Sequence, residues 1–129
     1  SLVIVTGGLG PTDNDITREA LRDFTGIALR EHPDVLAAMA RRFNVPPDEL
    51  RQNLRRQTLT PERGTYLRNA NGTAVGLVFE MDGHVVVALP GPPRELQPMV
   101  RDELPHCYLL RFYENMSAWG PVKTQETQV

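Results

Sequence analysis

The sequence contains a single cysteine, Cys107, and has no excess of positive charge. One thiol can form neither an internal disulfide nor a zinc site built from several cysteines, so we expect a reducing, cytoplasmic location. Lysine and arginine number 14 against 16 aspartate and glutamate residues, and the net charge is −2. A chain with this balance offers no overall cationic field to nucleic acid or to an anionic membrane. Any anion must therefore be bound by local geometry.

Long apolar runs and aromatic residues are also scarce. The longest apolar stretches, such as Val85–Leu89, are much shorter than the roughly 20 residues of a membrane-spanning helix, and no leader-like segment opens the chain. Tyr113 and Trp119 are too isolated to form a base-stacking platform. The three histidines lie far apart, and none has the spacing of a metal site. We therefore expect neither membrane nor nucleic-acid binding.

The residues that are present suit one folded domain. The chain has 129 residues, of which 40% are hydrophobic and 23% charged, as in an ordinary globular domain. Amphipathic helical patterns interleave with strand-like runs, which predicts a three-layer α/β domain with a mostly parallel sheet over residues 1–112. Residues 113–129 are polar and lack a clear period, and we interpret them as a linker or tail.

The expected elements follow from the hydrophobic pattern. The run Leu2–Val5 predicts a strand that is buried on both faces, and an interior strand in first position suggests a preceding segment. Further along, the pattern predicts helices at 15–25 (with Ile16, Ala20, Leu21 and Phe24 inward), 33–43, 48–57 and from Pro93, and strands at 65–67, 75–80, 84–89 and 107–112. The strands at 75–80 and 84–89 should form a hairpin around Asp82-Gly83.

The most informative motif is a glycine loop directly after the first expected strand, Thr6-Gly7-Gly8-Leu9-Gly10-Pro11-Thr12. Such a loop before a helix lets backbone amides approach phosphate oxygens, and the helix dipole adds about half a positive charge. The loop lacks the Gly-Lys-Ser/Thr of a P-loop and the third glycine of a dinucleotide fingerprint. We therefore predict a phosphate cradle of another kind.

Asp15 is the candidate for catalysis and for metal binding. A carboxylate beside a phosphate repels it unless a cation lies between them, and Mg²⁺ commonly joins one or two carboxylates to substrate phosphates. Alternatively, Asp13 and Asp15 only stabilise the helix N-terminus, which is worth about 0.3 to 1 kcal/mol. Both interpretations stay open.

Two other polar segments are notable. The loop Leu89–Glu95 also joins an expected strand to a helix, so it could form the opposite wall of a crevice at the carboxyl ends of the strands. The arginines Arg51, Arg55 and Arg56 form a local basic face on the helix expected at 48–57. Acidic residues lie nearby in the sequence, so we favour a solvated helix surface over a phosphate contact.

Together these motifs resemble the amino-terminal domain of the CinA (competence/damage-inducible protein) family, of the MoaB/MogA molybdopterin-binding superfamily. The matching residues run in order from Leu2 to Leu104: the glycine loop with Asp15, Thr17, Glu19 and Ala20; Asn53 and Gln57; Asn69 with Gly72-Thr73-Ala74; and Leu89–Leu96 with Pro98-Met99. Two positions differ from the family pattern, because Asn14 stands where an aspartate is common and Val75 where a proline is usual.

The resemblance implies a three-layer α/β/α molybdopterin-binding-like fold. The family's domain begins with a strand-helix-strand segment containing Gly-Thr-Glu, so we expect this domain to be amino-terminally incomplete. Carried over by position, the substrate-binding residues would be Thr6, Gly7, Gly8, Gly10, Pro11, Thr12, Gly72, Thr73, Pro90, Gly91 and Pro92, and Asp15 would hold the metal or orient water.

The resemblance also implies a function, the metal-dependent hydrolysis of ADP-ribose-type pyrophosphates. Two alternatives remain: molybdopterin binding or adenylylation in molybdenum cofactor biosynthesis, and a non-catalytic nucleotide-binding or oligomerisation module. The expected ligand is a nucleotide or pterin phosphate, with a divalent cation such as Mg²⁺. Family members commonly self-associate, and the expected helices around Val35 to Leu54 could supply an apolar interface.

Overall fold

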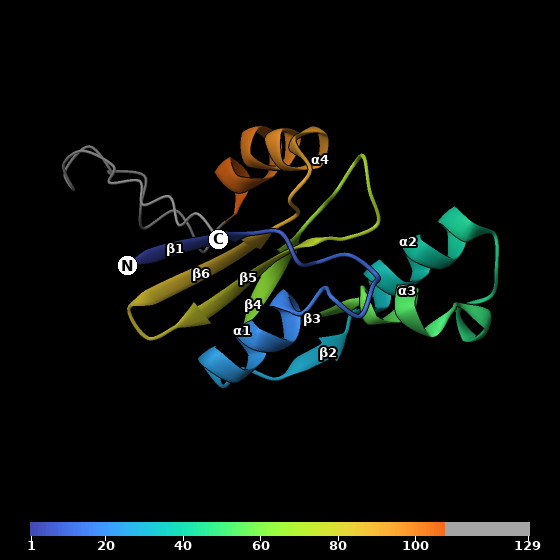
Figure 1. Ribbon diagram of the computed structural model, residues 1–129, viewed down its shortest axis with the longest axis horizontal. Coiled ribbons are helices and arrows are strands. Elements are labelled where there is room, and N and C mark those ends of the chain that lie inside the picture. Colours follow the sequence, from blue (N-terminus) through green and yellow to red (C-terminus); the bar gives the residue numbers. More distant parts are fainter. Residues whose placement is uncertain (108–129) are drawn as a thin grey trace.

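The computed structural model describes residues 1–107 (Figure 1). The tail at 113–129, and the strand expected at 107–112 beyond its first residue, lie outside the described residues. The elements are β1 (Leu2–Thr6), α1 (Thr17–Thr25), β2 (Leu29–Glu31), α2 (Pro33–Phe43), α3 (Gln52–Arg56), β3 (Leu59–Pro61), β4 (Gly64–Leu67), β5 (Gly76–Met81), β6 (His84–Leu89) and α4 (Pro93–Pro98). A 3₁₀ turn spans Pro47–Glu49, and α4 continues into a π-helical turn at Met99–Glu103 and a 3₁₀ turn at Leu104–His106.

Within residues 1–107 the main sheet has four strands in the order β1-β6-β5-β4, and β2 pairs with β3 in a separate two-stranded sheet. The α/β class is confirmed, but the main sheet is mixed, with β1 and β6 parallel and the β6–β5 and β5–β4 pairs antiparallel. The reason is local: β4, β5 and β6 follow one another through short connections, which favour antiparallel neighbours. The hairpin of β5 and β6 around Asp82-Gly83 is confirmed.

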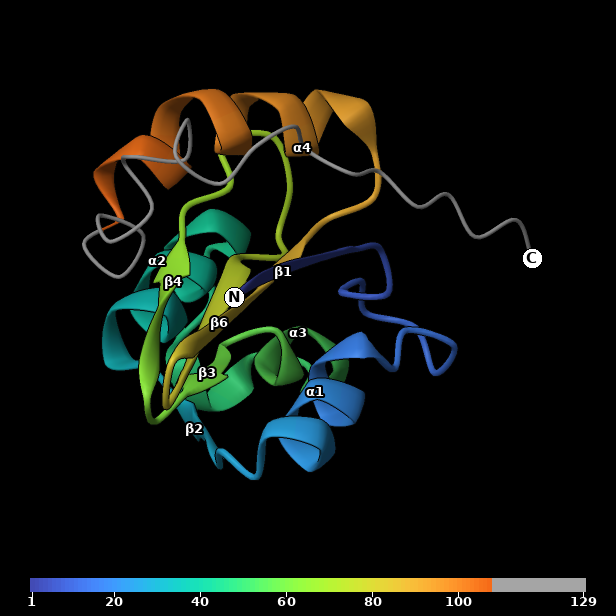
Figure 2. The same ribbon diagram turned by 90° about the vertical axis from the view of Figure 1, so that its left-hand side faces the viewer.

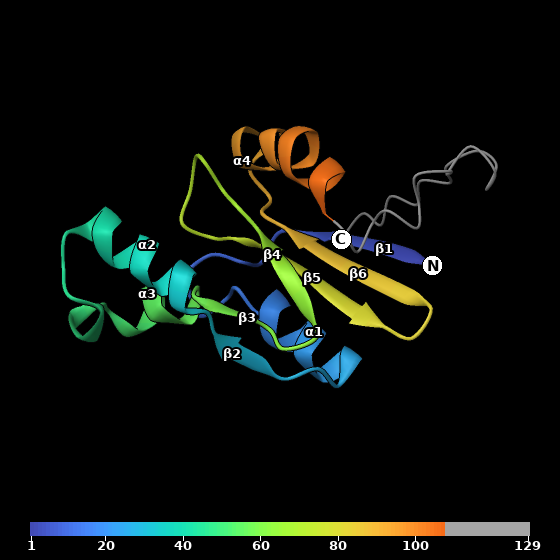
Figure 3. The ribbon, with the colours of Figure 1, turned by 180° about the vertical axis from the view of Figure 1, so that it is seen from behind.

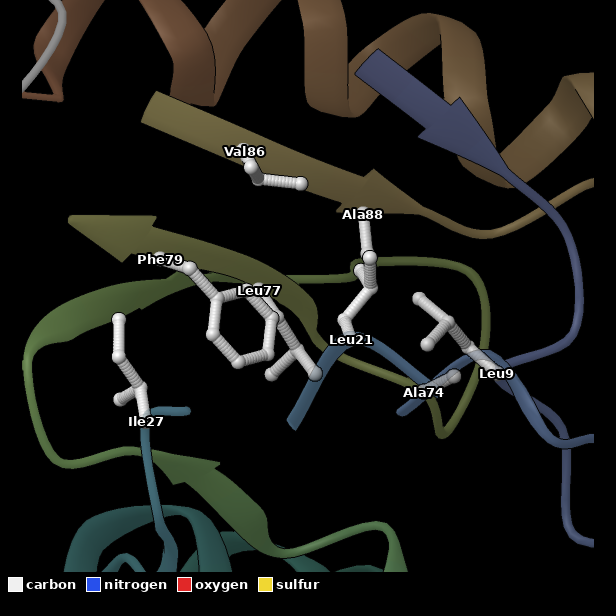
Figure 4. Packing of buried hydrophobic residues seen from close by; sticks show 8 residues of the cluster. All are labelled: Leu9, Leu21, Ile27, Ala74, Leu77, Phe79, Val86 and Ala88. Atoms are coloured by element: carbon white, nitrogen blue, oxygen red, sulfur yellow. The ribbon is translucent and has the colours of Figure 1, made fainter. Parts of the chain in front are cut away.

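Alternating side chains of β5 and β6 build two cores. Leu77, Phe79, Val86 and Ala88 pack with Leu21 of α1, and Figure 4 shows Leu21 directed toward these two strands. The opposite-facing residues of the same strands, including Val78, Val85 and Val87, pack with Met99 beyond α4. The sheet therefore lies between α4 on one face and α1 on the other, which Figure 2 shows nearly edge-on.

Two predictions about burial are wrong. Within the described residues β1 has a neighbour on one side only, and Val3 and Ile4 are 46% and 50% exposed, so β1 is an edge strand and not a buried one. On α1, Ile16 and Phe24 are exposed, whereas Arg18 and Leu21 are buried. The helix is therefore rotated about its axis relative to the prediction. In this orientation Arg18 faces the glycine loop, where it donates to the carbonyl of Leu9.

The region between α1 and β4 also differs from the prediction. The helix expected at 48–57 is divided into a 3₁₀ turn and the short α3, because Leu50 and Arg51 have extended backbone angles. The short strands β2 and β3 were not predicted. Val35, Met39 and Leu50, which were candidates for an apolar interface, are buried within the chain itself. Self-association stays a prediction.

No helix in residues 1–107 is long and apolar enough to cross a membrane.

Candidate functional site

Three loops enclose a crevice of about 490 Å³ at one end of the main sheet. They are the glycine loop between β1 and α1, the β4–β5 loop around residues 71–74, and the β6–α4 loop around residues 90–95. We call this space the crevice. It lies within the range of volumes that small-molecule sites have, about 300 to 1,000 Å³.

The pairing of β1 with β6 brings two of these loops together. Because the two strands are parallel, with Thr6 opposite Leu89, their carboxyl ends lie at the same edge of the sheet. The amide of Gly7 donates a hydrogen bond to the carbonyl of Leu89 over 2.8 Å. A Cβ atom on Gly91 would lie 3.4 Å from the Cα of Gly7, so both loops approach closely at glycines.

The predicted site residues meet at this crevice, with two exceptions. Those that line it are Gly7, Gly8, Gly10, Pro11, Asp15, Gly72, Thr73, Pro90, Gly91 and Pro92. Thr6 is the last residue of β1 and does not line it, and Thr12 instead holds Asp15. The lining also includes Leu9, Arg42, Gln57, Asn71, Ala74, Arg94 and Glu95, which were not in the predicted set. The binding roles of all these residues stay predictions.

Asp15 is held by the loop that precedes it. Its Oδ2 accepts hydrogen bonds from the amide of Thr12 over 3.0 Å and from the Thr12 hydroxyl over 2.6 Å. The hydroxyl of Thr12, followed by the amides of Thr12 and Gly10 and the positive charge of Arg56, lowers the pKa of Asp15, against the opposing effect of desolvation. Asp15 is therefore ionised at neutral pH.

The start of α1 shows whether Asp15 caps the helix by a hydrogen bond. The helix begins at Thr17, its N-cap is Ile16, and no side chain caps it. Thr17 closes the loop, because its hydroxyl donates to the carbonyl of Gly7 over 2.8 Å and its amide to the carbonyl of Gly8 over 3.1 Å. Asp15 therefore orders the glycine loop and is not a hydrogen-bonding cap of the helix, and both interpretations of its carboxylate stay predictions. Its carboxylate lines the crevice.

Arg56 connects α3 to the same loop. Its guanidinium forms an ion pair with Glu19 at 2.7 Å and donates to the backbone carbonyls of Thr12 and Asp15. Arg55 forms a second ion pair, with Glu31 at 2.8 Å. Both arginines remain partly exposed, 34% for Arg55 and 25% for Arg56, and their acidic partners come from β2 and α1, which the sequence interpretation did not foresee.

A buried cation lies beneath the glycine loop. Arg18 is 0% exposed, and its Nη2 donates to the carbonyl of Leu9 over 3.0 Å. Gln57 is also buried, and its Nε2 donates to the same carbonyl over 3.1 Å. Among residues 1–107, three buried polar atoms have no hydrogen-bond partner, namely Arg18 Nε and Nη1 and Gln57 Oε1. Burial lowers the pKa of Arg18, but an arginine remains charged in a protein.

The opposite wall is fixed by asparagines. The Nδ2 of Asn69 donates to the carboxylate of Glu95 and to the carbonyl of Ala74, both over 2.8 Å. The Nδ2 of Asn71 donates to the carbonyl of Arg94 over 2.7 Å. These bonds tie the β4–β5 loop to the start of α4. A Cβ atom on Gly72 would overlap the carboxylate of Glu95, which accounts for glycine at this position.

The side chains of the crevice could hold a metal ion only together with the oxygens of a phosphorylated ligand. Residues 1–107 contain no group of three or more histidine, cysteine, aspartate or glutamate side chains that could hold a metal ion. Thr12 engages Asp15 Oδ2, so Oδ1 is the oxygen that could bind a cation. One carboxylate oxygen combined with ligand phosphates is an arrangement that Mg²⁺ commonly adopts.

Comparisons with known proteins agree with this geometry. Residues 1–107 match the family model described as "Probable molybdopterin binding domain". The chain is 48% identical over 105 residues to a "Putative competence-damage inducible protein" of Streptococcus gordonii, an alignment that covers 81% of this chain and 25% of the relative. A protein of the same name from Caldicellulosiruptor bescii is 44% identical over 103 residues, with 80% and 25% covered.

A solved structure is similar as well. The crystal structure of the protein CinA from Thermoplasma acidophilum, whose title gives its function as unknown, matches with a TM-score of 0.69 and 32% identity. The match covers 78% of this chain and 58% of that one. The chain spans about a quarter of the length of the curated relatives it matches.

Proposed function

The chain belongs to the family described as "Probable molybdopterin binding domain" and is similar to part of the competence-damage inducible proteins, and from this premise we propose that it hydrolyses the pyrophosphate bond of a nucleotide sugar such as ADP-ribose. The observation that carries the proposal is the position of ionised Asp15 on a crevice whose other lining includes two glycine loops. The phosphates would occupy the crevice, and the reaction would take place beside Asp15.

Backbone and arginine groups would bind the diphosphate. Gly7, Gly8 and Gly91 line the crevice, and because glycine has no side chain, phosphate oxygens could approach the main chain at Gly7 and Gly91. Arg42 and Arg94 line the same space, and a guanidinium can donate two parallel hydrogen bonds to a phosphate. This combination binds a diphosphate without the lysine of a P-loop.

Asp15 would act on the attacking water. A water molecule adds to one phosphorus, the bond from that phosphorus to the bridging oxygen breaks, and ADP-ribose yields AMP and ribose 5-phosphate. The ionised carboxylate can orient this water, and the released proton passes to solvent, because the lowered pKa of Asp15 makes it a weak base. Asp15 would hold a divalent cation, whose charge would neutralise negative charge on the phosphates. Thr12 and Arg56 would keep the carboxylate in place.

Measurement of AMP release from ADP-ribose, with and without Mg²⁺, tests this proposal. Asp15→Asn should reduce the rate at least about 100-fold, because the cation would lose its charged ligand and its stabilisation of the phosphates is worth several kcal/mol. Asp23→Asn is the matched control, because Asp23 lies on α1, is exposed and pairs with Arg22. It should keep the rate of the unmodified chain within about twofold. Absence of AMP release, or full activity in Asp15→Asn, would overturn the proposal.

The family description favours a second candidate, the binding or adenylylation of molybdopterin in the same crevice. A pterin phosphate that binds tightly, with no turnover of ADP-ribose, would support this candidate. A non-catalytic nucleotide-binding module would instead bind ADP-ribose equally well with and without a chelator and release no AMP.

A further inference from the structure

A second pocket, of about 530 Å³, adjoins the crevice. It lies between α2 and the β4–β5 loop, and we call it the side pocket. Figures 1 and 3 show this loop extending beyond the sheet in the space between α4 and α2. Arg42, Gly72 and Thr73 line both the crevice and the side pocket. The two spaces are therefore neighbours with a common wall.

Arg42 forms the junction between them. Its Nη1 donates a hydrogen bond to the carbonyl of Gly72 over 2.9 Å, which connects α2 to the β4–β5 loop. A ligand with phosphates in the crevice would pass this guanidinium where it enters the side pocket. A phosphate at the junction would thus meet a positive charge that is already positioned.

The lining of the side pocket differs in character from that of the crevice. Its walls are partly apolar, with Ala37, Ala38 and Val75, and one wall carries the ring of Tyr66. The Tyr66 ring meets the ring of His32 edge to face, with centroids 4.8 Å apart. His32 caps α2 by accepting the amide of Asp34, so Tyr66 lies against a fixed neighbour. An oriented aromatic ring with small apolar residues suits a flat ring in the ligand.

Cationic side chains complete this lining. The lining contains a single acidic residue, Asp34, and three arginines, Arg41, Arg42 and Arg68. None of the three arginines forms an ion pair within residues 1–107. A guanidinium stacks on heteroaromatic rings and pairs with anionic groups. The surplus of unpaired positive charge excludes a cationic ligand and favours an electron-rich one.

We propose that the side pocket binds the heteroaromatic ring of a nucleotide whose phosphates occupy the crevice, with Tyr66 and Arg68 as its recognition residues. This proposal rests on the proposed function, because it takes phosphate binding in the crevice as given. It adds that the preferred ligand has a base on the far side of Arg42. The ring should therefore increase affinity beyond that of the phosphates alone.

A comparison of ADP with inorganic pyrophosphate tests this proposal, because the two ligands share a diphosphate and differ by adenosine. Titration calorimetry on the full chain with Mg²⁺ should give at least about tenfold tighter binding of ADP, given the affinity that base stacking usually adds. Tyr66→Ala should weaken ADP about tenfold and change pyrophosphate less than twofold. Tyr66→Phe should keep both affinities. Phe24→Ala is the control, because it removes an exposed ring from α1.

Arg68→Gln should weaken ADP several-fold without changing pyrophosphate. Its control is Arg51→Gln, another exposed arginine that does not line the side pocket. If Tyr66→Ala affects both ligands equally or neither, or if pyrophosphate binds as tightly as ADP, the side pocket is not a base site. If the unmodified chain binds neither ligand, the proposed function itself fails. The outcomes therefore separate the two proposals.

Discussion

At the scale of single residues, the carbonyl of Leu9 is the point on which the glycine loop is fixed. Arg18 and Gln57 donate to it from below, and both side chains are buried. Buried donors without partners cost stability, since they lose their hydrogen bonds with water. The positive charge of Arg18 is therefore costly for stability. We infer that it serves binding, because it would attract an anion in the adjacent crevice.

The substitution Arg18→Met tests whether the charge of Arg18 lowers stability and strengthens anion binding. Replacement of a buried, incompletely paired charge by an apolar side chain of similar volume is often neutral or stabilising. We therefore expect the free energy of unfolding, from urea titration, to stay within about 1 kcal/mol of the unmodified value or to rise. Binding of pyrophosphate should weaken several-fold, since the positive charge beneath the loop is lost. A loss of stability above about 3 kcal/mol with unchanged binding would instead mark Arg18 as purely structural.

The pH dependence of stability should report the bond between Thr12 and Asp15. The folded state lowers the pKa of Asp15 below its ordinary value of 3.8. A carboxylate with a lowered folded pKa stabilises the fold above its unfolded pKa, and this stability is lost as pH falls through the folded pKa. Thr12→Val should therefore reduce the free energy of unfolding by about 1 kcal/mol at neutral pH.

The difference between Thr12→Val and the unmodified chain should shrink below a pH of about 4, the ordinary range for aspartate. Chemical unfolding between pH 2 and pH 7 measures it. Thr65→Val, a change on β4, is the control and should show no such pH dependence. A difference that stays constant across this range would show that the hydroxyl does not act through the charge of Asp15.

The sequence predicts the crevice residues that belong to a contiguous motif, and it fails for those that reach it from elsewhere. Glycines and prolines in the two loops are visible because their positions relative to the strands are regular. Arg18 and Arg56, which hold the glycine loop, are not visible, because an arginine on a helix is usually solvated. Gln57 matches the family pattern, but the sequence gives it no role. Their roles depend on the rotation of α1 and on the position of α3, which only the packed structure gives.

At the scale of elements, the pairing of β4 with β5 depends on one glycine. Gly64 begins β4 opposite Phe79, with a φ of 148°, and a Cβ atom there would overlap the backbone carbonyl of Val78. Gly64→Ala should therefore cost at least about 3 kcal/mol of unfolding free energy, because backbone cannot move aside as a flexible side chain can.

Gly83→Ala provides the matched comparison. Gly83 has a φ of 72° in the β5–β6 turn, but no atom lies within 4 Å of an added Cβ. The substitution should cost only the strain of the left-handed conformation, about 1 to 2 kcal/mol. Thermal unfolding of both variants measures the difference. Equal losses would show that the contact at Gly64 relaxes without cost.

Elements with a strong period were predictable, and those without one were not. The hairpin of β5 and β6 and the helix α2 are correct, since each has a long apolar pattern with turn or cap residues at its ends. The strands β2 and β3 have three residues each, which is too short for an alternating pattern. β1 has the composition of a buried strand but one neighbour in the described residues, and composition alone does not give position in a sheet.

At the scale of the whole molecule, β5 and β6 serve both the stability of the domain and the geometry of the site. Their side chains fill the cores on the two faces of the sheet, so their positions are strongly determined. The β4–β5 and β6–α4 loops leave the ends of these strands and form two of the three walls of the crevice. Because these loops leave rigid strands, their glycines can keep fixed positions relative to one another. Recognition of a diphosphate requires such fixed positions.

Metal removal distinguishes a resident metal site from one completed by the ligand. Residues 1–107 contain no cluster of three metal-binding side chains, so a chelator should leave the melting temperature of the ligand-free chain unchanged. ADP, which is not a nucleotide sugar and so is not the proposed substrate, should add about 2.7 kcal/mol of stability at about 100 times its dissociation constant, or roughly 10 °C for a domain of this size. Calorimetry with and without Mg²⁺ measures both effects.

The increase in stability on ligand binding should fall sharply without Mg²⁺, because the phosphates then meet the negative charge of Asp15 directly. A chelator that lowers the melting temperature without ligand would instead reveal a metal bound by the protein alone.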